Sequence, residues 1–136
     1  MLARATIPAL AAALLVAGCG PPHARKPGVY DLGATAKCLS DNGLRVRKNP
    51  PGLDLVTSSA PAGALRSSLA GTTFVIGFGD TESDALLLVK GYQRSASSPR
   101  ELKRLASLLD REGNAVIYWQ KEPTGAQSTS VRSCLR

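Results

Sequence analysis

Few residues of this chain combine the side-chain types and the spacing that catalysis requires. Its serines are numerous, but none lies in a Gly-x-Ser-x-Gly sequence, which would place a nucleophile on a sharp turn. His23 is the only histidine, and it lies in the proline-rich segment 20–28. A folded domain beyond that segment therefore lacks the commonest catalytic base and metal ligand. The residues predict no cofactor and no metal centre, and they favour a protein that is not an enzyme.

The turn from Gly77 to Glu82 joins a predicted strand to a predicted helix, and such turns can hold a phosphate group with backbone amides. It lacks the third glycine of a dinucleotide fingerprint and the lysine of a P-loop. Its acids Asp80, Glu82 and Asp84 would repel phosphate, whereas the helix dipole favours acids at a helix start. We interpret the segment as a well-capped turn. A small-ligand or catalytic site at Gly77–Asp84 is the alternative.

The first eighteen residues are typical of a secretory signal. Arg4 supplies a charged start, an apolar run extends from Ala9 to Ala17, and the segment ends in small residues. A transmembrane helix needs about 20 apolar residues, and this run is shorter and follows Pro8 directly. The sequence therefore predicts an export signal over residues 1–18 rather than a membrane span.

The end of this signal, LVAGC at positions 15–19, resembles the lipobox of bacterial lipoproteins. The resemblance covers only this junction, and it implies cleavage after Gly18 and a diacylglyceryl group on Cys19. Two or three acyl chains hold a protein durably, because each buried methylene contributes about 0.8 kcal/mol. The resemblance thus implies a lipid-anchored protein of the bacterial cell envelope. Its domain would lie on the extracytoplasmic side, behind a flexible tether over residues 19–28.

Cys38 and Cys134 remain as a pair if Cys19 carries the lipid. An even pair of cysteines in an exported chain indicates a disulfide, because the compartment is oxidising. Closing a loop of about a hundred residues stabilises the folded chain by about 4 to 5 kcal/mol in the chain-entropy model. A redox-active or metal-binding pair is the alternative, but the sequence has no Cys-x-x-Cys and no second cluster of ligands.

The chain is basic, with 17 Lys and Arg against 10 Asp and Glu. Each cation close to an anionic lipid surface contributes about 1 kcal/mol to binding. Nucleic acid is disfavoured as a partner, because the chain is predicted to be exported and only 4% of its residues are aromatic. Anionic lipid, wall polymer or an envelope protein fits better. The candidate contact residues, which could form one positive patch, are Arg45, Arg47, Lys48, Arg100, Lys103, Arg104 and Arg111.

The elements that carry these residues begin with a predicted helix over 32–41. Asp31 is suited to cap it, and Gly43 supplies the left-handed conformation that ends it. Apolar and basic residues then alternate over 44–47, which predicts a short strand with both arginines on one exposed face. These patterns place Cys38 on the first helix.

The middle of the chain is less uniform. A second short strand is predicted over 53–56, and 57–70 has no firm pattern and is interpreted as irregular. Alternating β-branched and aromatic residues predict a strand over 72–78. A capping-box pattern then favours a helix over 81–94, and the alternative is a hairpin partner strand from Leu86 to Tyr92.

The clearest helical pattern follows. Ser98, Pro99 and Glu101 indicate its start, leucines repeat at helical spacing, and Gly113 is interpreted as its end. An interior strand is predicted over 115–120. Residues 123–130 are interpreted as a polar turn region before the C-terminal tail.

These elements predict one α+β or α/β domain over residues 29–136. It would have a single sheet of about three to four strands with two to three helices packed on it. Helices join the strand at 72–78 to the strand at 115–120, so a parallel pair with a right-handed crossover is expected. The tail 131–136 should bring Cys134 back to the first helix. We therefore expect a non-catalytic envelope lipoprotein whose domain binds a partner or an anionic surface component.

Overall fold

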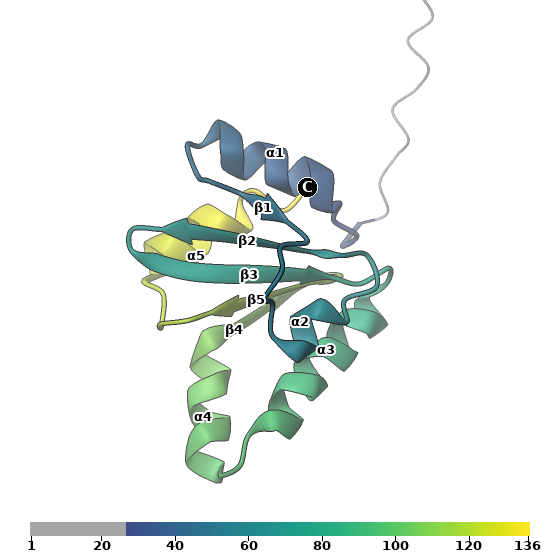
Figure 1. Ribbon diagram of the computed structural model, residues 1–136, viewed down its shortest axis with the longest axis vertical. Helices are drawn as coiled ribbons and strands as arrows, with labels where there is room; N and C mark the ends of the chain where they lie inside the picture. The colour runs from purple at the N-terminus through teal and green to yellow at the C-terminus, as the bar shows by residue number, and fades with distance from the viewer. Residues whose placement is uncertain (1–26) are drawn as a thin grey trace, which may run out of the picture.

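A five-stranded sheet forms the centre of the computed structural model, which describes residues 27–136 (Figure 1). The strand order is β1-β2-β3-β5-β4, and every neighbouring pair is antiparallel. The strands are β1 (Arg47–Lys48), β2 (Ala64–Leu69), β3 (Thr72–Phe78), β4 (Leu109–Glu112) and β5 (Ala115–Trp119). The predicted single sheet in a mixed domain is confirmed as α+β, but it has five strands rather than three or four.

Helices lie on both sides of this sheet, α1 and α5 on one side and α2, α3 and α4 on the other (Figure 1). Their bounds are α1 (Leu32–Asp41), α2 (Leu55–Ser58), α3 (Glu82–Ser95), α4 (Pro99–Leu108) and α5 (Gly125–Arg132). The sequence predicts α1, α3 and α4, and these three are confirmed. The rival strand from Leu86 to Tyr92 is wrong, because those residues belong to α3.

The larger core lies between the sheet and helices α1 and α5. Strand side chains such as Phe74, Ile76, Ile117 and Trp119 are fully buried there. Leu39 of α1 and residues of the C-terminal segment complete the same cluster. The side chains of Phe74 and Trp119 also pack ring against ring, with centroids 4.9 Å apart.

A disulfide between Cys38 and Cys134 closes this core, with the two Cα atoms 5.4 Å apart. It joins α1 to the segment that follows α5, so both the predicted pairing and the predicted return of the tail are confirmed. The backbone amide of Asp31 also donates a hydrogen bond to the carbonyl of Arg136. The two ends of the described chain are thereby held together.

A smaller core lies on the opposite side of the sheet, formed by Ala85, Leu88 and Tyr92 of α3 with Val116 of β5. Gly91 weakens α3 in the sequence, and the structure explains its presence. A Cβ atom at position 91 would lie 3.1 Å from a methyl group of Val56 in α2. A side chain there would push α2 away from α3.

Strand β2 corrects the interpretation of 57–70 as irregular. Its sequence contains serines and an arginine, which have low strand propensity, but it pairs with six residues of β3. Ala70 and Gly71 both have positive φ in the turn between them, which matches the twist of a two-residue hairpin. Pairing with a neighbouring strand therefore outweighs local preference.

Helices α2 and α5 correct two further predictions. Residues 53–56 are not a strand, because the Asp54 carboxylate accepts a hydrogen bond from the Thr57 amide at 2.8 Å and begins α2. Residues 123–130 are not a turn region, because Thr124 and Gln127 form a capping box that begins α5. The α5 signal was present in the sequence and was overlooked.

Strand β4 corrects the topology. The helix that begins at Pro99 ends at Leu108 rather than at Gly113, and the next four residues form an edge strand. This strand reverses the chain once more before β5, so β5 is antiparallel to β3 and the predicted parallel pair is wrong.

The pairing of β1 is limited to Arg47–Lys48, shorter than the predicted strand. The alternation itself is confirmed, because Leu44 and Val46 pack against the core while Arg45 and Arg47 are exposed.

Candidate functional site

Helices α3 and α4 form a hairpin that projects from the sheet beside β4 (Figure 1). Thr81 begins α3 in a capping box, and its amide donates to the Asp84 carboxylate at 2.9 Å. Ser98 caps α4 by accepting a hydrogen bond from the Glu101 amide at 3.2 Å. Both starts were predicted from the sequence, because caps depend on residues three positions apart.

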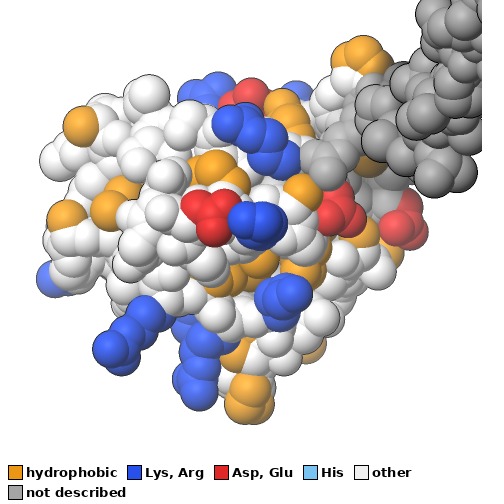
Figure 2. Space-filling view, turned by 90° about the horizontal axis from the view of Figure 1, so that it is seen from above, with side chains coloured by type: hydrophobic (Ala, Val, Ile, Leu, Met, Phe, Trp, Pro, Cys, Tyr) orange, Lys and Arg blue, Asp and Glu red, His pale blue; other side chains and the backbone are white. Residues whose placement is uncertain are grey.

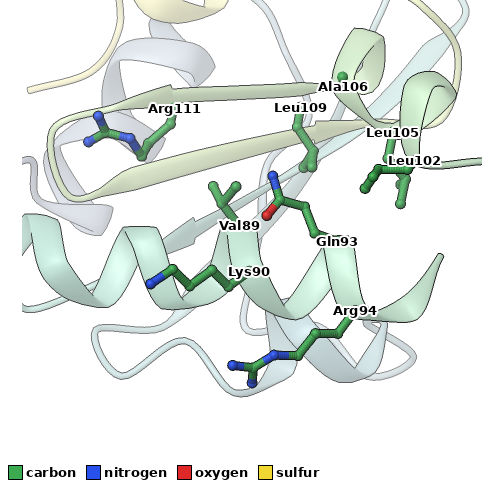
Figure 3. Close-up of a pocket in the computed structure, with 9 residues that line it drawn as sticks. All are labelled: Val89, Lys90, Gln93, Arg94, Leu102, Leu105, Ala106, Leu109 and Arg111. Carbon is green, nitrogen blue, oxygen red and sulfur yellow. The ribbon is translucent and has the colours of Figure 1, made fainter. Parts of the chain in front are cut away.

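A groove of about 550 Å³ runs between α3 and α4 and reaches β4 (Figure 3). Its volume lies in the range of about 300 to 1,000 Å³ that is typical of ligand pockets. Its apolar lining consists of Val89, Leu102, Leu105, Ala106 and Leu109, and its polar lining of Lys90, Gln93, Arg94 and Arg111. In Figure 3 the two α4 leucines lie at one end, and the side chains of Lys90 and Arg111 extend toward the other.

The three cations of the groove have no carboxylate partner within the part of the chain that the structure describes. No salt bridge there involves Lys90, Arg94 or Arg111. The Arg111 guanidinium donates one hydrogen bond, to the carbonyl of Gly113 at 3.3 Å. The groove therefore combines an aliphatic lining with cationic groups that can bind an anion.

The surrounding hairpin strengthens this positive field. Residues 85–109 contain five Lys and Arg and a single acid, Glu101. Hydrogen bonds from the Ser97 hydroxyl and amide lower the pKa of Glu101, so it is ionised at neutral pH. Its carboxylate is held at the start of α4, and Glu101 does not line the groove.

Large hydrophobic side chains are exposed on the same side of the molecule. Within residues 27–136 these are Leu55 of α2 (86% exposed), Leu86 and Leu87 of α3 (45% and 60%) and Leu102 of α4 (44%). A second groove of about 530 Å³ lies between α2 and α3 and includes Leu55 and Leu87 in its lining. Clusters of exposed apolar residues mark surfaces that contact a partner or a membrane.

The structure separates the basic residues that the sequence suggested as one patch. Arg45, Arg47 and Lys48 lie at the β1 edge of the sheet, and Arg111 lies in β4 at the opposite edge. The others, Arg100, Lys103 and Arg104, are exposed on α4. Figure 2 shows the α1 side, where Lys and Arg side chains lie at separate points with acidic ones between some of them. The seven residues therefore do not form a single patch, and of them only Arg111 lines the groove.

Lys90 and Arg94 are groove residues that the sequence reasoning missed. They are four positions apart, which places them on one side of a helix. That signal was present, but the uncertainty between helix and strand over 86–92 concealed it. Their position became clear only with α3 assigned as a helix.

The turn at Gly77–Asp84 is filled by the protein itself. A Cβ atom on Gly79 would lie 2.6 Å from the Cβ of Asp84. The Gly79 carbonyl accepts a hydrogen bond from the Asn114 side chain at 2.6 Å, and its amide donates to the Asn114 carbonyl. The Asp84 carboxylate is occupied in the capping box. These contacts make the turn a structural junction, as interpreted from the sequence.

Acidic, cysteine and histidine side chains do not gather into a metal-binding cluster anywhere in residues 27–136. The carboxylates suggested by the sequence, Asp80, Glu82 and Asp84, follow the turn at the start of α3, where Glu82 and Asp84 occupy the first turn of the helix. They are placed as the helix dipole favours.

A buried polar cluster not foreseen from the sequence joins α2 to α3. The Tyr92 hydroxyl is hydrogen-bonded to the Thr57 hydroxyl and donates to the Asp54 carboxylate at 3.0 Å. Burial raises the pKa of Tyr92, so the hydroxyl stays protonated. Its ring stacks on Tyr118 at a centroid distance of 4.8 Å. The cluster fixes the helix that carries Lys90 and Arg94.

The predicted signal, the lipidation site Cys19 and His23 lie outside the described residues. Within the described ones, none of the helices has the length and the apolar content to cross a bilayer. The fold and the site together define a small α+β domain with an amphipathic, cationic groove. The chain matches no protein-family model, no curated protein and no solved structure.

Proposed function

We propose that this chain is a lipid-anchored lipoprotein of the bacterial envelope, and that its domain binds anionic lipid without catalysing a reaction. The lipobox-like LVAGC at positions 15–19 supports the anchor. The disulfide between Cys38 and Cys134 supports an extracytoplasmic location, because disulfides persist in oxidising compartments.

The observation that carries the binding role is the composition of the α3–α4 hairpin. It combines cations that form no salt bridge within residues 27–136, such as Lys90 and Arg94, with exposed leucines, such as Leu87 and Leu102. Surfaces that lie in a membrane interface pair apolar side chains with Lys and Arg in this way. A wall polymer would use the charges but not the leucines, so anionic lipid is the better partner.

The position of the tether is compatible with this role. Gly28 accepts a hydrogen bond from the Asn114 amide, close to the start of α3. The eight residues that follow Cys19 up to Pro27 span at most about 29 Å when extended. The hairpin can therefore reach the bilayer that holds the proposed anchor.

Two measurements test the proposal. Mass spectrometry of the protein from membranes should find a lipidated N-terminal Cys19, and Cys19→Ser should release the protein from the membrane fraction. Residues 28–136 should cosediment with phosphatidylglycerol vesicles but not with phosphatidylcholine vesicles, and salt should weaken the binding. An unmodified Cys19 contradicts the lipid anchor. Equal binding to both kinds of vesicle contradicts the binding of anionic lipid.

A charge-reversal pair makes the second measurement specific to the hairpin. Arg94→Glu with Arg104→Glu should weaken vesicle binding at least tenfold, because each cation contributes about 1 kcal/mol. The matched control is Arg45→Glu with Arg47→Glu in β1 and just before it, which changes the net charge equally at the β1 edge of the sheet. Equal loss in both variants would assign the binding to net charge alone.

A further inference from the structure

We infer that the groove between α3 and α4 holds one acyl chain of an anionic phospholipid, with the headgroup at Lys90, Arg94 and Arg111. The inference rests on the proposed function and deepens it. In this mode of binding the domain takes up a single lipid molecule from the bilayer, in place of adsorbing to the bilayer surface in general.

The lining of the groove is suited to a hydrocarbon chain. Leucines from α4 and β4 face Val89 of α3, and Leu105 at the base is only 9% exposed. The lining contains no aromatic side chain, and Gln93 is its one uncharged polar residue. Burying an acyl chain against such side chains removes apolar surface from water on both partners.

The charged end of the groove is suited to an acidic headgroup. Lys90 and Arg94 lie one helical turn apart on α3, and Arg111 lines the same groove from β4. Arginine can bind a phosphate through two parallel hydrogen bonds, and lysine adds a mobile point charge. In Figure 3 the Lys90 and Arg111 side chains extend away from Leu102 and Leu105, and Arg94 begins nearer those leucines but extends in the same direction as Lys90.

This combination selects one class of ligand. A small inorganic anion would not use the aliphatic lining, and a neutral hydrocarbon would leave the cations without a partner. An anionic lipid satisfies both ends of the groove. The bilayer that carries the proposed anchor supplies this lipid directly.

Photo-crosslinking of the full lipidated chain in vesicles tests the inference. The probe is phosphatidylglycerol with a diazirine on one acyl chain, and the control probe is phosphatidylcholine with the same chain. We expect phosphatidylglycerol to label groove residues such as Val89, Leu105 and Ala106 at least fivefold more strongly, as mapped by mass spectrometry. Labelling near Cys19 serves as the internal standard, because the anchor places that segment beside lipid.

Two independent variants should remove this labelling. Ala106 is exposed, so Ala106→Trp fills the groove without entering the core. Lys90→Glu with Arg94→Glu removes the headgroup contacts and leaves the apolar lining intact. Each should lower groove labelling at least fivefold, whereas Arg45→Glu with Arg47→Glu should leave it unchanged. Circular dichroism melts confirm that each variant is folded.

Three outcomes overturn the inference, and they distinguish it from the proposed function. Labelling confined to exposed residues such as Leu55 and Leu87 means adsorption to the bilayer without lipid in the groove. Full labelling in Ala106→Trp likewise excludes an acyl chain between the helices. Equal labelling by both probes, or none on α2 to α4, contradicts the groove and the anionic-lipid function together.

Discussion

On the α1 and α5 side of the sheet, thirteen buried residues of the described chain form one continuous cluster, which a disulfide closes. On the α2, α3 and α4 side the corresponding cluster has only four buried residues, and large leucines remain in water. Buried apolar area stabilises a fold by about 25 cal/mol per Å². The first side therefore supplies most of the stability, and the second leaves apolar and cationic side chains exposed.

This division predicts that stability and lipid binding can be changed separately. Substitutions on the α1 and α5 side should lower the free energy of unfolding and leave the affinity of the folded protein unchanged. Substitutions at the hairpin surface should have the reverse effect. The following variants test the division from the largest effect to the smallest.

Removing the disulfide should have the largest effect. Cys38→Ser with Cys134→Ser should lower the free energy of unfolding by about 4 kcal/mol, because 96 positions separate the two cysteines. The melting temperature should fall by about 15 °C. An unchanged melt would contradict the stabilising role, and reduced vesicle binding by the folded variant at low temperature would contradict the division between the two sides.

Removing the buried hydroxyl of Tyr92 should have an intermediate effect. Tyr92→Phe leaves Asp54 and Thr57 without one hydrogen-bond partner, which should cost about 1 to 2 kcal/mol in urea unfolding. The matched control is Tyr118→Phe in the stacked neighbour, with an expected change below about 0.5 kcal/mol. An equal loss in the control would mean that the cost of removing a tyrosine hydroxyl is not specific to the polar cluster between α2 and α3.

Replacing the exposed leucines should barely change stability. Leu87→Ser with Leu102→Ser should alter the free energy of unfolding by less than about 0.5 kcal/mol, since both side chains already contact water. Vesicle binding should fall about tenfold or more. Each leucine buried in the membrane interface contributes up to about 1.5 to 3 kcal/mol of binding free energy, and serine does not supply it. Strong unfolding with intact binding would reverse the assignment of the two sides.

Acid should produce the smallest effect, at the start of α4. The Ser97 hydrogen bonds lower the pKa of Glu101 below its ordinary value of 4.5, so they stabilise the hairpin above that pH. This contribution is lost as the pH falls through the lowered pKa. The stability difference between wild type and Glu101→Gln should therefore shrink in thermal melts as the pH falls below 4.5. A difference that is independent of pH would contradict the role of the ionised carboxylate.

Prediction from the sequence succeeded where the signal was local. Asp31, Thr81 and Ser98 each cap a helix by accepting a hydrogen bond from an amide three positions along, and all three starts were predicted. The strand at 72–78 was predicted because its β-branched and aromatic residues alternate. The disulfide followed from cysteine count and compartment, which require no knowledge of the fold.

The local caps of α2 and α5 were overlooked, and the remaining failures occurred where the partner lies far along the chain. Ser67 is buried in β2 because it pairs with Phe74 and donates a hydrogen bond to the Arg45 carbonyl at 2.9 Å. Nothing in the neighbouring sequence indicates either contact. Asp110 and Arg111 were assigned to the preceding helix, because the strand β4 that contains them forms only by pairing with β5.

The candidate site was also predicted only in part. The sequence identified the cations of α4 and β4, because a basic helix face is visible in residue order alone. It also grouped them with Arg45 and Arg47, which the sheet order places at the opposite edge. The groove itself required both α3 and α4, so Lys90 and Leu105 had no recognisable role until the two helices were placed side by side.

The sequence by itself therefore determined the starts of α1, α3 and α4, the cysteine pairing, the basic character and the lipobox-like junction. Each of these depends on composition or on contacts within a few residues. The tertiary structure alone decided the five-strand order, the unequal cores and the union of cations with leucines in one groove. These depend on antiparallel pairing between distant segments, and that pairing is selected by burial over the whole sheet rather than by any local pattern.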